Sequence, residues 1–256
     1  MTKTRLPAMS CSQHEALAHN QNPSHQKPMV SATAILKQLK AQASPANLDG
    51  MARFGMAIDK RLGISVPVMR QIARQAGKNH QLALKLWQTG YAEARIVASM
   101  VAVPEQLTDE QIESWVKGIN SWDVCDQFCM NLLWRVSFAR QKIAQWARRE
   151  EEFVKRAAYA LIACLAWHDK TAADREFLQL LTIIKQGATD ERNFVRKAVN
   201  WALRGIGKRS VRLNKAAIKT AKEIQRIDSK AARWIAADAL RELERAAVQR
   251  RLAARL

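Results

Sequence analysis

The sequence predicts an all-α fold, a HEAT-like or armadillo-type helical repeat solenoid with a concave basic face. Glycine and proline together number 9 + 6 = 15 residues, too few for the many turns of a sheet protein. Strong helix formers dominate instead, and no stretch shows the apolar–polar alternation of a strand. Pairs of amphipathic segments recur about every 35–45 residues, the length of HEAT and armadillo units, which stack into curved arrays. A compact helical bundle is the alternative.

The helical pattern starts near Ala32 and continues through the rest of the chain. The sequence Ser-Val-Pro-Val at 65–68 starts a helix that runs towards Gly77, because proline is favoured in a first helical turn and glycine just past a helix end. The next two helices are expected over residues 80–89 and 92–101. Each is short enough to form one half of a repeat unit.

The remaining helix starts are predicted from capping and periodicity. Thr108 and Gln111 form a capping-box pattern, in which each side chain satisfies a free backbone N–H group. Further helices are expected to begin at Trp122, Phe138, Glu151, about Ala172, Asp190, Lys215 and Ser229. The domain division follows: residues 1–30 as a flexible N-terminal tail, 31–245 as the repeat domain, and 246–256 as a basic C-terminal tail or helix end.

The charge of the chain indicates a polyanionic partner. The formal net charge is +19, from 42 Lys and Arg against 23 Asp and Glu, and residues 190–256 alone carry 18 of the basic and 7 of the acidic residues. A field of this size attracts nucleic acid or an anionic membrane. No apolar run approaches the roughly 20 residues that span a bilayer, so nucleic acid is favoured. A basic surface that serves solubility alone is the alternative.

Cysteine usage and the N-terminal composition predict the compartment. The four cysteines form no dense disulfide framework, and no secretory leader with a long apolar core is recognisable. We therefore expect a cytoplasmic protein that associates with the nucleoid. Cys125, Cys129, Cys164 and His168 have i, i+4 spacings that two zinc-ligand pairs could use. Because free cysteines are ordinary residues of helix cores, we expect no metal.

The first cluster with chemical potential is Ser-Trp-Asp-Val-Cys-Asp at residues 121–126. Trp122 and Asp126 are four residues apart and share one helical face, whereas Val124 and Phe128 point into the core. On spacing alone, a buried tryptophan beside a capping or salt-bridged aspartate is the favoured interpretation, because tryptophan serves packing more often than function.

A second cluster lies on the helix expected from Asp190. Six apolar residues make its core face: Val195, Ala198, Val199, Ala202, Leu203 and Ile206. A separate stripe at helical spacing carries Lys197, Trp201, Arg204 and Lys208. Aromatic surface that meets sugar or base, with cations that meet phosphate, suits a nucleic-acid ligand. Trp201 as a core residue beside a solvated basic edge is equally compatible with the pattern.

Arg156 lies between these two clusters in the sequence. It falls on a different face from Phe153, Ala157 and Leu161. From the pattern alone it is interpreted as an ordinary surface arginine.

Several of these segments together resemble the AlkD-type DNA alkylation repair proteins, a family of HEAT-like repeat alkylpurine DNA glycosylases. The matching segments are residues 51–54, 62–70, 121–126, 154–158 and 197–204, in the family's order and spacing. The resemblance covers roughly residues 32–243. It implies a HEAT-like helical solenoid, in agreement with the repeat pattern, and an enzyme that excises N3- and N7-alkylated purines from duplex DNA.

The resemblance also implies roles for single residues. Asp126 matches the catalytic carboxylate, Trp122 and Trp201 match the tryptophans that bracket the deoxyribose, and Arg156 matches an arginine that contacts the DNA backbone. We expect Lys197, Arg204 and Lys208 to bind DNA as well. The chain departs from the family pattern at two positions, because Ser121 replaces a tryptophan and Phe54 a tyrosine.

The chemistry agrees with these roles. An N3- or N7-alkylated purine is already cationic, so the enzyme must chiefly stabilise the oxocarbenium-like sugar left behind. A carboxylate at Asp126 supplies the opposite charge, and the faces of the two tryptophans add cation–π stabilisation. The resemblance implies capture through sugar and backbone, without a base-flipping pocket. We expect a monofunctional enzyme, since no lysine stands out as a Schiff-base nucleophile.

The expected partner is double-stranded DNA that contains alkylated purines, with no cofactor, no membrane and no obligate protein partner. The protein is expected to be a monomer. The main alternative is a non-catalytic HEAT-repeat module that binds damaged or branched DNA. A solenoid that binds acidic peptides is a third possibility, but it has no need for the two tryptophans.

Overall fold

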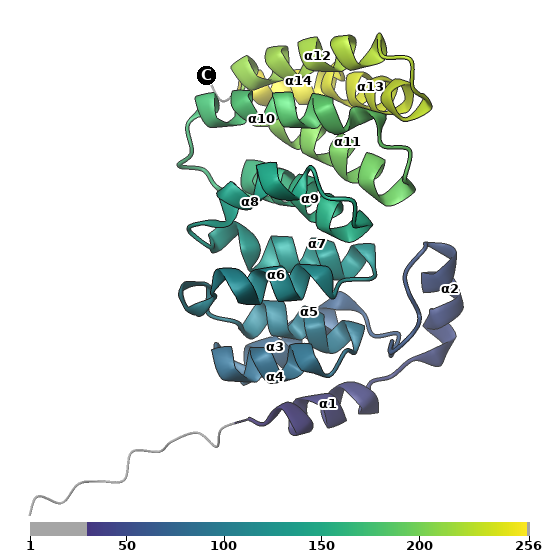
Figure 1. Ribbon diagram of the computed structural model, residues 1–256, viewed down its shortest axis with the longest axis vertical. Helices are drawn as coiled ribbons and strands as arrows, with labels where there is room; N and C mark the ends of the chain where they lie inside the picture. The colour runs from purple at the N-terminus through teal and green to yellow at the C-terminus, as the bar shows by residue number, and fades with distance from the viewer. Residues whose placement is uncertain (1–29, 255–256) are drawn as a thin grey trace, which may run out of the picture.

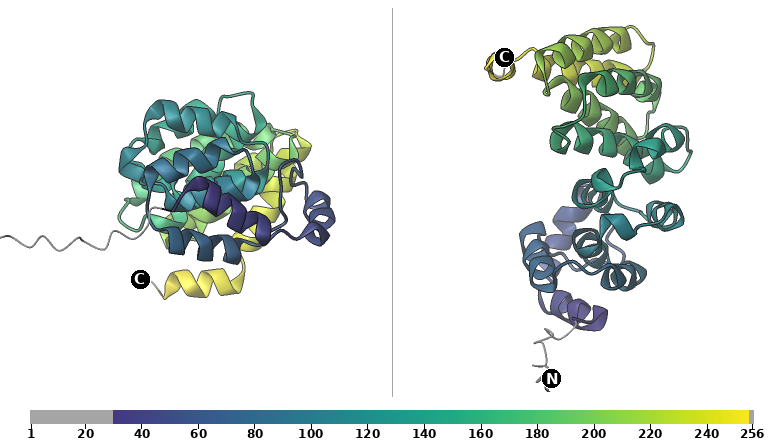
Figure 2. Two further views of the ribbon diagram at one scale, coloured as in Figure 1. Left: turned by 90° about the horizontal axis from the view of Figure 1, so that it is seen from below. Right: turned by 90° about the vertical axis from the view of Figure 1, so that its left-hand side faces the viewer.

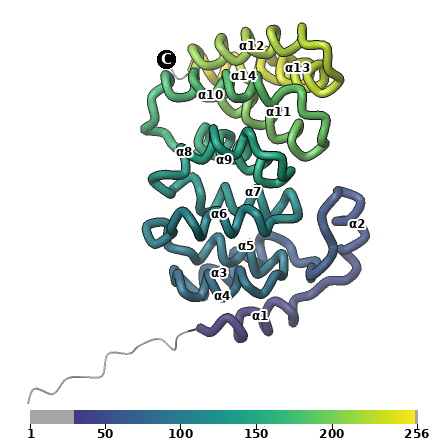
Figure 3. Tube along the Cα trace, in the orientation of Figure 1, coloured from purple at the N-terminus to yellow at the C-terminus, as the bar shows by residue number. Residues whose placement is uncertain are grey.

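A computed structural model describes residues 30–254, and every regular element in that range is a helix. The helices stack into an elongated array with α1 at one end and α12, α13 and α14 at the other (Figures 1 and 2). The Cα trace in Figure 3 follows the same path. The predicted helical solenoid is therefore confirmed, and the compact bundle is excluded. The predicted N-terminal tail, residues 1–30, lies outside the described residues except for its last position.

Fourteen α-helices are present among the described residues: α1 (Ala32–Ala41), α2 (Leu48–Arg53), α3 (Val66–Ala76), α4 (His80–Gln88), α5 (Ala92–Val101), α6 (Asp109–Lys117), α7 (Trp122–Asn131), α8 (Ala139–Trp146), α9 (Glu152–His168), α10 (Asp174–Gln186), α11 (Asn193–Gly207), α12 (Val211–Gln225), α13 (Lys230–Leu243) and α14 (Ala246–Ala253). Four short 3-10 turns lie between them: Pro45–Asn47, Pro104–Gln106, Leu133–Arg135 and Gly187–Thr189. None of the helices in this part of the chain has the length and apolar character to cross a membrane.

One layer of the stack consists of α5, α7, α9, α11 and α13, each packed on the next. Helices α4, α8 and α12 pack against α5, α9 and α13, respectively. At the centre of that layer α9 is buried almost all round, and its alanines let α11 approach closely. A Cβ atom added to Gly205 of α11 would lie 3.5 Å from the Cα of Ala163. The small residues of these two helices therefore set the spacing of the middle of the stack.

Polar contacts repeat at a constant sequence separation, as expected for a repeat protein. Lys185 pairs with Glu223 at 2.7 Å, and Asn200 donates to Asp238 at 2.6 Å. The partners in both pairs are 38 residues apart. Equivalent positions of successive units are thus in contact, which supports the repeat period of the sequence pattern.

Most predicted helix starts agree with the structure within two residues, and the capping box at Thr108 and Gln111 is present. Two starts are wrong. The helix expected from Lys215 is α12, which begins at Val211 because the Ser210 hydroxyl accepts the N–H of Leu213 at 3.1 Å. The helix expected from Asp190 begins at Asn193, because the Asp190 side chain is occupied with Arg192.

The loop that leads into α3 is held by a buried carboxylate. Glu93 of α5 has no exposed surface, and its Oε1 accepts the backbone N–H groups of Leu62 and Gly63 at 3.0 and 2.9 Å. Bonds from backbone donors to a charged acceptor are among the stronger ones. The start of α3, which lines the cleft described below, is therefore fixed from inside the stack.

Candidate active site

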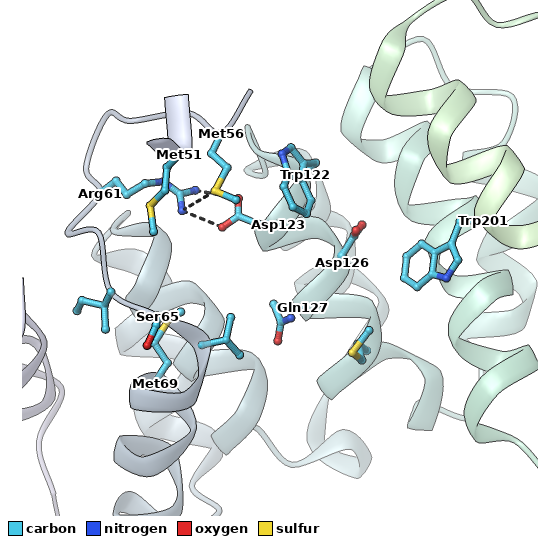
Figure 4. Close-up of a pocket in the computed structure, with 13 residues that line it drawn as sticks. Met51, Met56, Arg61, Ser65, Met69, Trp122, Asp123, Asp126, Gln127 and Trp201 are labelled. Carbon is cyan, nitrogen blue, oxygen red and sulfur yellow. Dashed lines mark hydrogen bonds and ion pairs between the residues drawn. The ribbon is translucent and has the colours of Figure 1, made fainter. Parts of the chain in front are cut away.

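A cleft of about 380 Å³ lies between α3, α7 and the segment that follows α2 (Figure 4). From α7 come Trp122 and Asp126, the two residues that the sequence placed on one helical face. Trp201 of α11 faces Asp126 from the other side (Figure 4). The structure thus brings the three predicted catalytic residues to the wall of a single cleft.

Trp122 is the first residue of α7, and its indole ring is held from outside that helix. The indole Nε1–H donates to the backbone carbonyl of Phe54 at 3.0 Å. The ring of Phe54 itself is 76% exposed. The guanidinium carbon of Arg156 lies 5.9 Å from the centre of the Trp122 ring, in cation–π range. The Trp122 ring is therefore oriented by two parts of the chain, helix α9 and the segment that follows α2.

Asp126 forms a bidentate ion pair with Arg156 of α9. The Arg156 Nε and Nη2 atoms donate to the Asp126 Oδ1 and Oδ2 atoms at 3.0 and 2.7 Å. The exposed fractions of the two side chains are 6% for Arg156 and 15% for Asp126. Arg156 also donates to the carbonyl of Phe194 in α11. The interpretation of Arg156 as an ordinary surface arginine is wrong, because this side chain joins α7, α9 and α11 inside the stack.

Two opposing effects act on the protonation of Asp126. Burial raises the pKa of Asp126 above its ordinary value, and the charge and hydrogen bonds of Arg156 oppose that rise. The bidentate pair favours the ionised form, because both carboxylate oxygens accept hydrogen bonds from a charged guanidinium. Asp126 is thus a partly exposed carboxylate with one fixed cation behind it and the cleft in front.

Trp201 lies at the border between core and cleft. Its ring is half-buried and packs against the core cluster. The six apolar residues predicted for the core face of α11 are all fully buried. Both sequence-based interpretations of Trp201, as a core residue and as a residue of the ligand site, therefore hold in part. One part of its ring packs in the core and another part lines the cleft.

The departure at Ser121 has a structural reason. Ser121 is 1% exposed, and its hydroxyl donates to Asp123 at 2.5 Å and accepts the N–H of Ala57 at 3.2 Å. Asp123 in turn holds Arg61 through two bonds of 2.8 and 2.9 Å. This cluster attaches the segment after α2 to the start of α7. A tryptophan at position 121 would displace it.

Replacement of Ser121 by alanine is expected to lower the free energy of unfolding by about 1–3 kcal/mol, because the part-buried N–H of Ala57 and the buried guanidinium of Arg61 lose an acceptor. Urea-induced unfolding measures the change. The matched control is Ser137→Ala, which alters an exposed serine and should leave the midpoint unchanged. Equal stability of the two variants would contradict the conclusion that Ser121 attaches the segment after α2 to the start of α7.

The predicted DNA-binding cations differ in their surroundings. Lys197 is exposed. Lys208 pairs with Glu242 of α13 at 2.6 Å, and Arg204 contacts the same carboxylate and lies 3.6 Å from Asp238. A phosphate would have to compete with these acidic partners for Arg204 and Lys208. DNA binding by the three side chains remains a prediction.

The cysteines that could have ligated zinc are engaged with the backbone. The Cys125 and Cys129 thiols donate to the carbonyls of Phe153 and Ala157 at 3.6 and 3.7 Å. Burial raises the pKa of Cys129 and of Cys164 well above the usual value, which disfavours the thiolate that a metal requires. Residues 30–254 contain no cluster of three or more residues with metal-binding side chains.

Several residues of the cleft were not predicted from the sequence. Arg61 and Asp123 were missed because their partners are about sixty residues apart, a separation that no periodicity reveals. Met130 could have been found, since it follows Trp122 and Asp126 at the same four-residue step. Met51 of α2 and Met56 of the segment after it carry no such signal.

The stack of paired helices defines a HEAT-like repeat protein, and its cleft carries a carboxylate between two tryptophans. The chain belongs to the DNA alkylation repair enzyme family, whose model matches residues 35–243. No curated protein matches the chain.

The fold is shared with a solved structure from a new family of proteins related to the HEAT-like repeat DNA glycosylases, with affinity for branched DNA structures. That protein is 19% identical to this one. The match covers 83% of this chain and 95% of the other, with a TM-score of 0.67. At this identity the likeness shows the common fold alone.

Proposed function

We propose that this protein is a monofunctional DNA glycosylase that hydrolyses the N-glycosidic bond of N3- and N7-alkylated purines in duplex DNA. The observation that carries the proposal is the Asp126 carboxylate, which lines one cleft together with Trp122 and Trp201. Binding of phosphates alone gains nothing from a carboxylate at the ligand. Membership in the DNA alkylation repair enzyme family supports this assignment.

Each site residue then has a defined task. The bond between C1′ and the purine nitrogen breaks, and its electron pair neutralises the positive charge of the departing base. The sugar gains oxocarbenium character, which the Asp126 carboxylate and the faces of Trp122 and Trp201 stabilise. A water oxygen bonds to C1′, and its proton passes to Asp126 or to solvent. No covalent enzyme intermediate is required.

Arg156 acts on this site indirectly, through its ion pair with Asp126. It keeps Asp126 ionised and fixes its orientation, so that the carboxylate needs no rearrangement as charge develops on the sugar. A contact between Arg156 and the DNA backbone, which the resemblance implies, would compete with the bonds of its Nη atoms to Phe194 and Asp126. The net charge of +19 draws the duplex to the protein. We propose that the protein acts as a monomer in the cytoplasm, at the nucleoid, without a cofactor.

The second candidate function is non-catalytic binding of damaged or branched DNA. One observation favours it: both oxygens of Asp126 are already engaged by Arg156, which lowers the charge available to a sugar cation. The structural relative described above has affinity for branched DNA. Non-catalytic DNA binding requires the basic residues and the tryptophans. It does not require an Asp126 carboxylate that is free to stabilise a sugar cation.

Base release from alkylated duplexes separates the two functions. The protein is incubated in excess with a duplex that contains N7-methylguanine or N3-methyladenine, and the free base is quantified. Its affinities for unmodified duplex and for a four-way junction are measured at the same salt concentration. Release well above the spontaneous rate supports the glycosylase. No release, together with tighter binding of the junction than of the duplex, would overturn it in favour of the binding module.

A further inference from the structure

A second group of aromatic and basic side chains lies at the end of α9 that is remote from the cleft. We call this surface the α9 edge and define it by Trp134, Arg135, Trp167, His168 and Lys170. We propose that the α9 edge binds an unpaired DNA strand, with a base stacked on the exposed ring of Trp167 and phosphates on the surrounding cations. The inference goes beyond the proposed function, because it adds a DNA site that takes no part in base release.

The α9 edge is separate from the cleft. Arg156, which holds Asp126, lies near the start of α9, and Trp167 follows eleven positions later, about 16 Å along the helix axis at 1.5 Å per residue. The connection between α9 and α10 forms the left edge of the stack in Figure 1, whereas α2, beside the cleft, lies on the right. No residue of the α9 edge lines the cleft. A strand bound at this edge therefore leaves Asp126 accessible to a duplex.

Trp167 presents its ring to solvent. It is 70% exposed, whereas Trp234, the other exposed tryptophan of residues 30–254, is 38% exposed. A single exposed apolar side chain is ordinary on a protein surface, so the surroundings of Trp167 decide its meaning. The ammonium of Lys170 lies 5.9 Å from the centre of the Trp167 ring, in cation–π range. An open aromatic face beside a cation is the arrangement that binds single strands, with a base stacked on the ring.

A second aromatic surface adjoins the first. The rings of Trp134 and His168 are stacked, with 4.8 Å between their centres and 11° between their planes. The guanidinium carbon of Arg135 lies 5.0 Å from the centre of the Trp134 ring. Burial and the charges of Arg135 and Lys170 lower the pKa of His168, so the stacked pair is uncharged at pH 7. The α9 edge thus holds two aromatic surfaces, each with a cation beside it, which matches the alternation of bases and phosphates along a strand.

The basic residues continue from the α9 edge to α3. Burial and the charge of Arg135 lower the pKa of Lys78, so these two cations act on each other. Lys78 donates to two backbone carbonyls at the end of α5, both at 2.9 Å, which leaves its third N–H for a phosphate. It shares a groove of about 320 Å³ with Arg70 and Arg74 of α3. A strand that begins at Trp167 therefore meets further phosphate partners in this groove.

Acidic side chains offer little competition to a phosphate here. Among the described residues, Arg70, Arg74 and Arg135 form no ion pair, in contrast to the two paired cations of α11. Asp169 is held by an arginine of α8, and Glu105 lies beyond ion-pair distance of the groove lysine. A duplex could satisfy the same cations, but its base faces are stacked within the helix. Only an unpaired strand also uses the exposed ring.

The first test compares two single strands of about ten nucleotides, within the usual site size. One is oligothymidylate, and the other consists of tetrahydrofuran abasic residues with the same number of phosphates. Fluorescence anisotropy should show that the wild-type protein binds oligothymidylate about tenfold more tightly, the equivalent of one stacked base. Trp167→Ala should reduce this preference to less than about twofold and retain the affinity for the abasic strand.

Trp234→Ala is the matched control, because it removes another exposed tryptophan with a cation beside its ring, Arg196 at 5.3 Å. Trp234 belongs to α13 and not to the α9 edge, so this variant should preserve the tenfold preference. Equal affinities of the wild-type protein for the two strands would overturn the strand site. A preference that Trp167→Ala retains would overturn it as well.

The second test concerns the phosphates. Arg135→Ala should weaken the binding of both strands and reduce the slope of log affinity against log salt concentration by about 0.7, the value of one phosphate contact in a single strand. Lys219→Ala, which removes an exposed lysine of α12, should leave the slope unchanged. An unchanged slope for Arg135→Ala would contradict phosphate contact at the α9 edge. Polyglutamate that displaces labelled oligothymidylate as well as unlabelled oligothymidylate does would overturn the strand in favour of an acidic peptide.

Base release keeps this inference apart from the proposed function. Trp167→Ala should release N7-methylguanine from a duplex within about twofold of the wild-type rate, because Trp167 does not line the cleft. Loss of the strand preference with normal base release would support a separate site. Loss of both would overturn the separate site and place Trp167 in the glycosylase centre. A strand preference in a protein that releases no base would support the α9 edge and overturn the enzyme.

Discussion

Replacement of Asp126 by asparagine is expected to slow base release by two to three orders of magnitude, the usual effect of removing one preorganised electrostatic group. Asparagine is nearly isosteric but neutral, so it offers the developing sugar cation no opposite charge. Excision of N7-methylguanine under single-turnover conditions measures the rate constant. Affinity for the same duplex should change little, because phosphate contacts dominate binding.

The matched control is Asp169→Asn, which alters an ion-paired aspartate of similar exposure at the other end of α9. Its effect on base release should stay within about twofold, because it contacts no residue of the cleft. If Asp126→Asn and Asp169→Asn excise equally fast, Asp126 has no electrostatic role in the reaction. The carboxylate would then be a structural partner of Arg156.

Replacement of Arg156 by alanine is expected to lower the free energy of unfolding by about 3–5 kcal/mol, because it leaves the largely buried Asp126 without its cation. It should also change the pH dependence of excision. Burial already raises the pKa of Asp126, and Arg156 is the main effect that opposes the rise. Without Arg156 the pKa rises further, so excision should fail at a higher pH as the solution is acidified. Guanidinium unfolding and a pH–rate profile measure the two effects.

The double variant Asp126→Ala, Arg156→Ala provides the control for stability. It removes the unpaired charge, so it should be more stable than Arg156→Ala alone, although it lacks more atoms. Additive losses of stability would contradict a direct interaction between the two groups. A pH–rate profile of Arg156→Ala that coincides with that of the wild-type protein would show that the titration of Asp126 does not limit the reaction.

The sequence predicts those features that depend on local periodicity. The helices follow from apolar spacing and caps, and the common face of Trp122 and Asp126 follows from their four-residue step. The core face of α11 follows in the same way. Errors at helix starts come from single side chains such as Ser210, which caps α12 earlier than the apolar pattern suggests.

Features formed between distant segments could not be predicted. The partner of Arg156 is 30 residues away on α7, and the acidic partners of Arg204 and Lys208 are on α13. An isolated helix does not reveal which carboxylate will lie beside its cations. The sequence therefore predicted that Arg204 and Lys208 of α11 are free to bind DNA, whereas in the fold both are paired with acidic side chains. The cleft itself depends on a loop that packs against α7, for which the chain gives no periodic signal.

The order of helices in the central layer has a mechanical consequence. Trp122 belongs to α7 and Trp201 to α11, and α9 lies between these helices. Repeat arrays can bend along their whole length, because each unit contacts only its neighbours. A flexural motion of the stack therefore opens or closes the gap between the two indole rings. A bent duplex that strains the two ends of the stack would thus change the distance between the Trp122 and Trp201 rings on either side of Asp126.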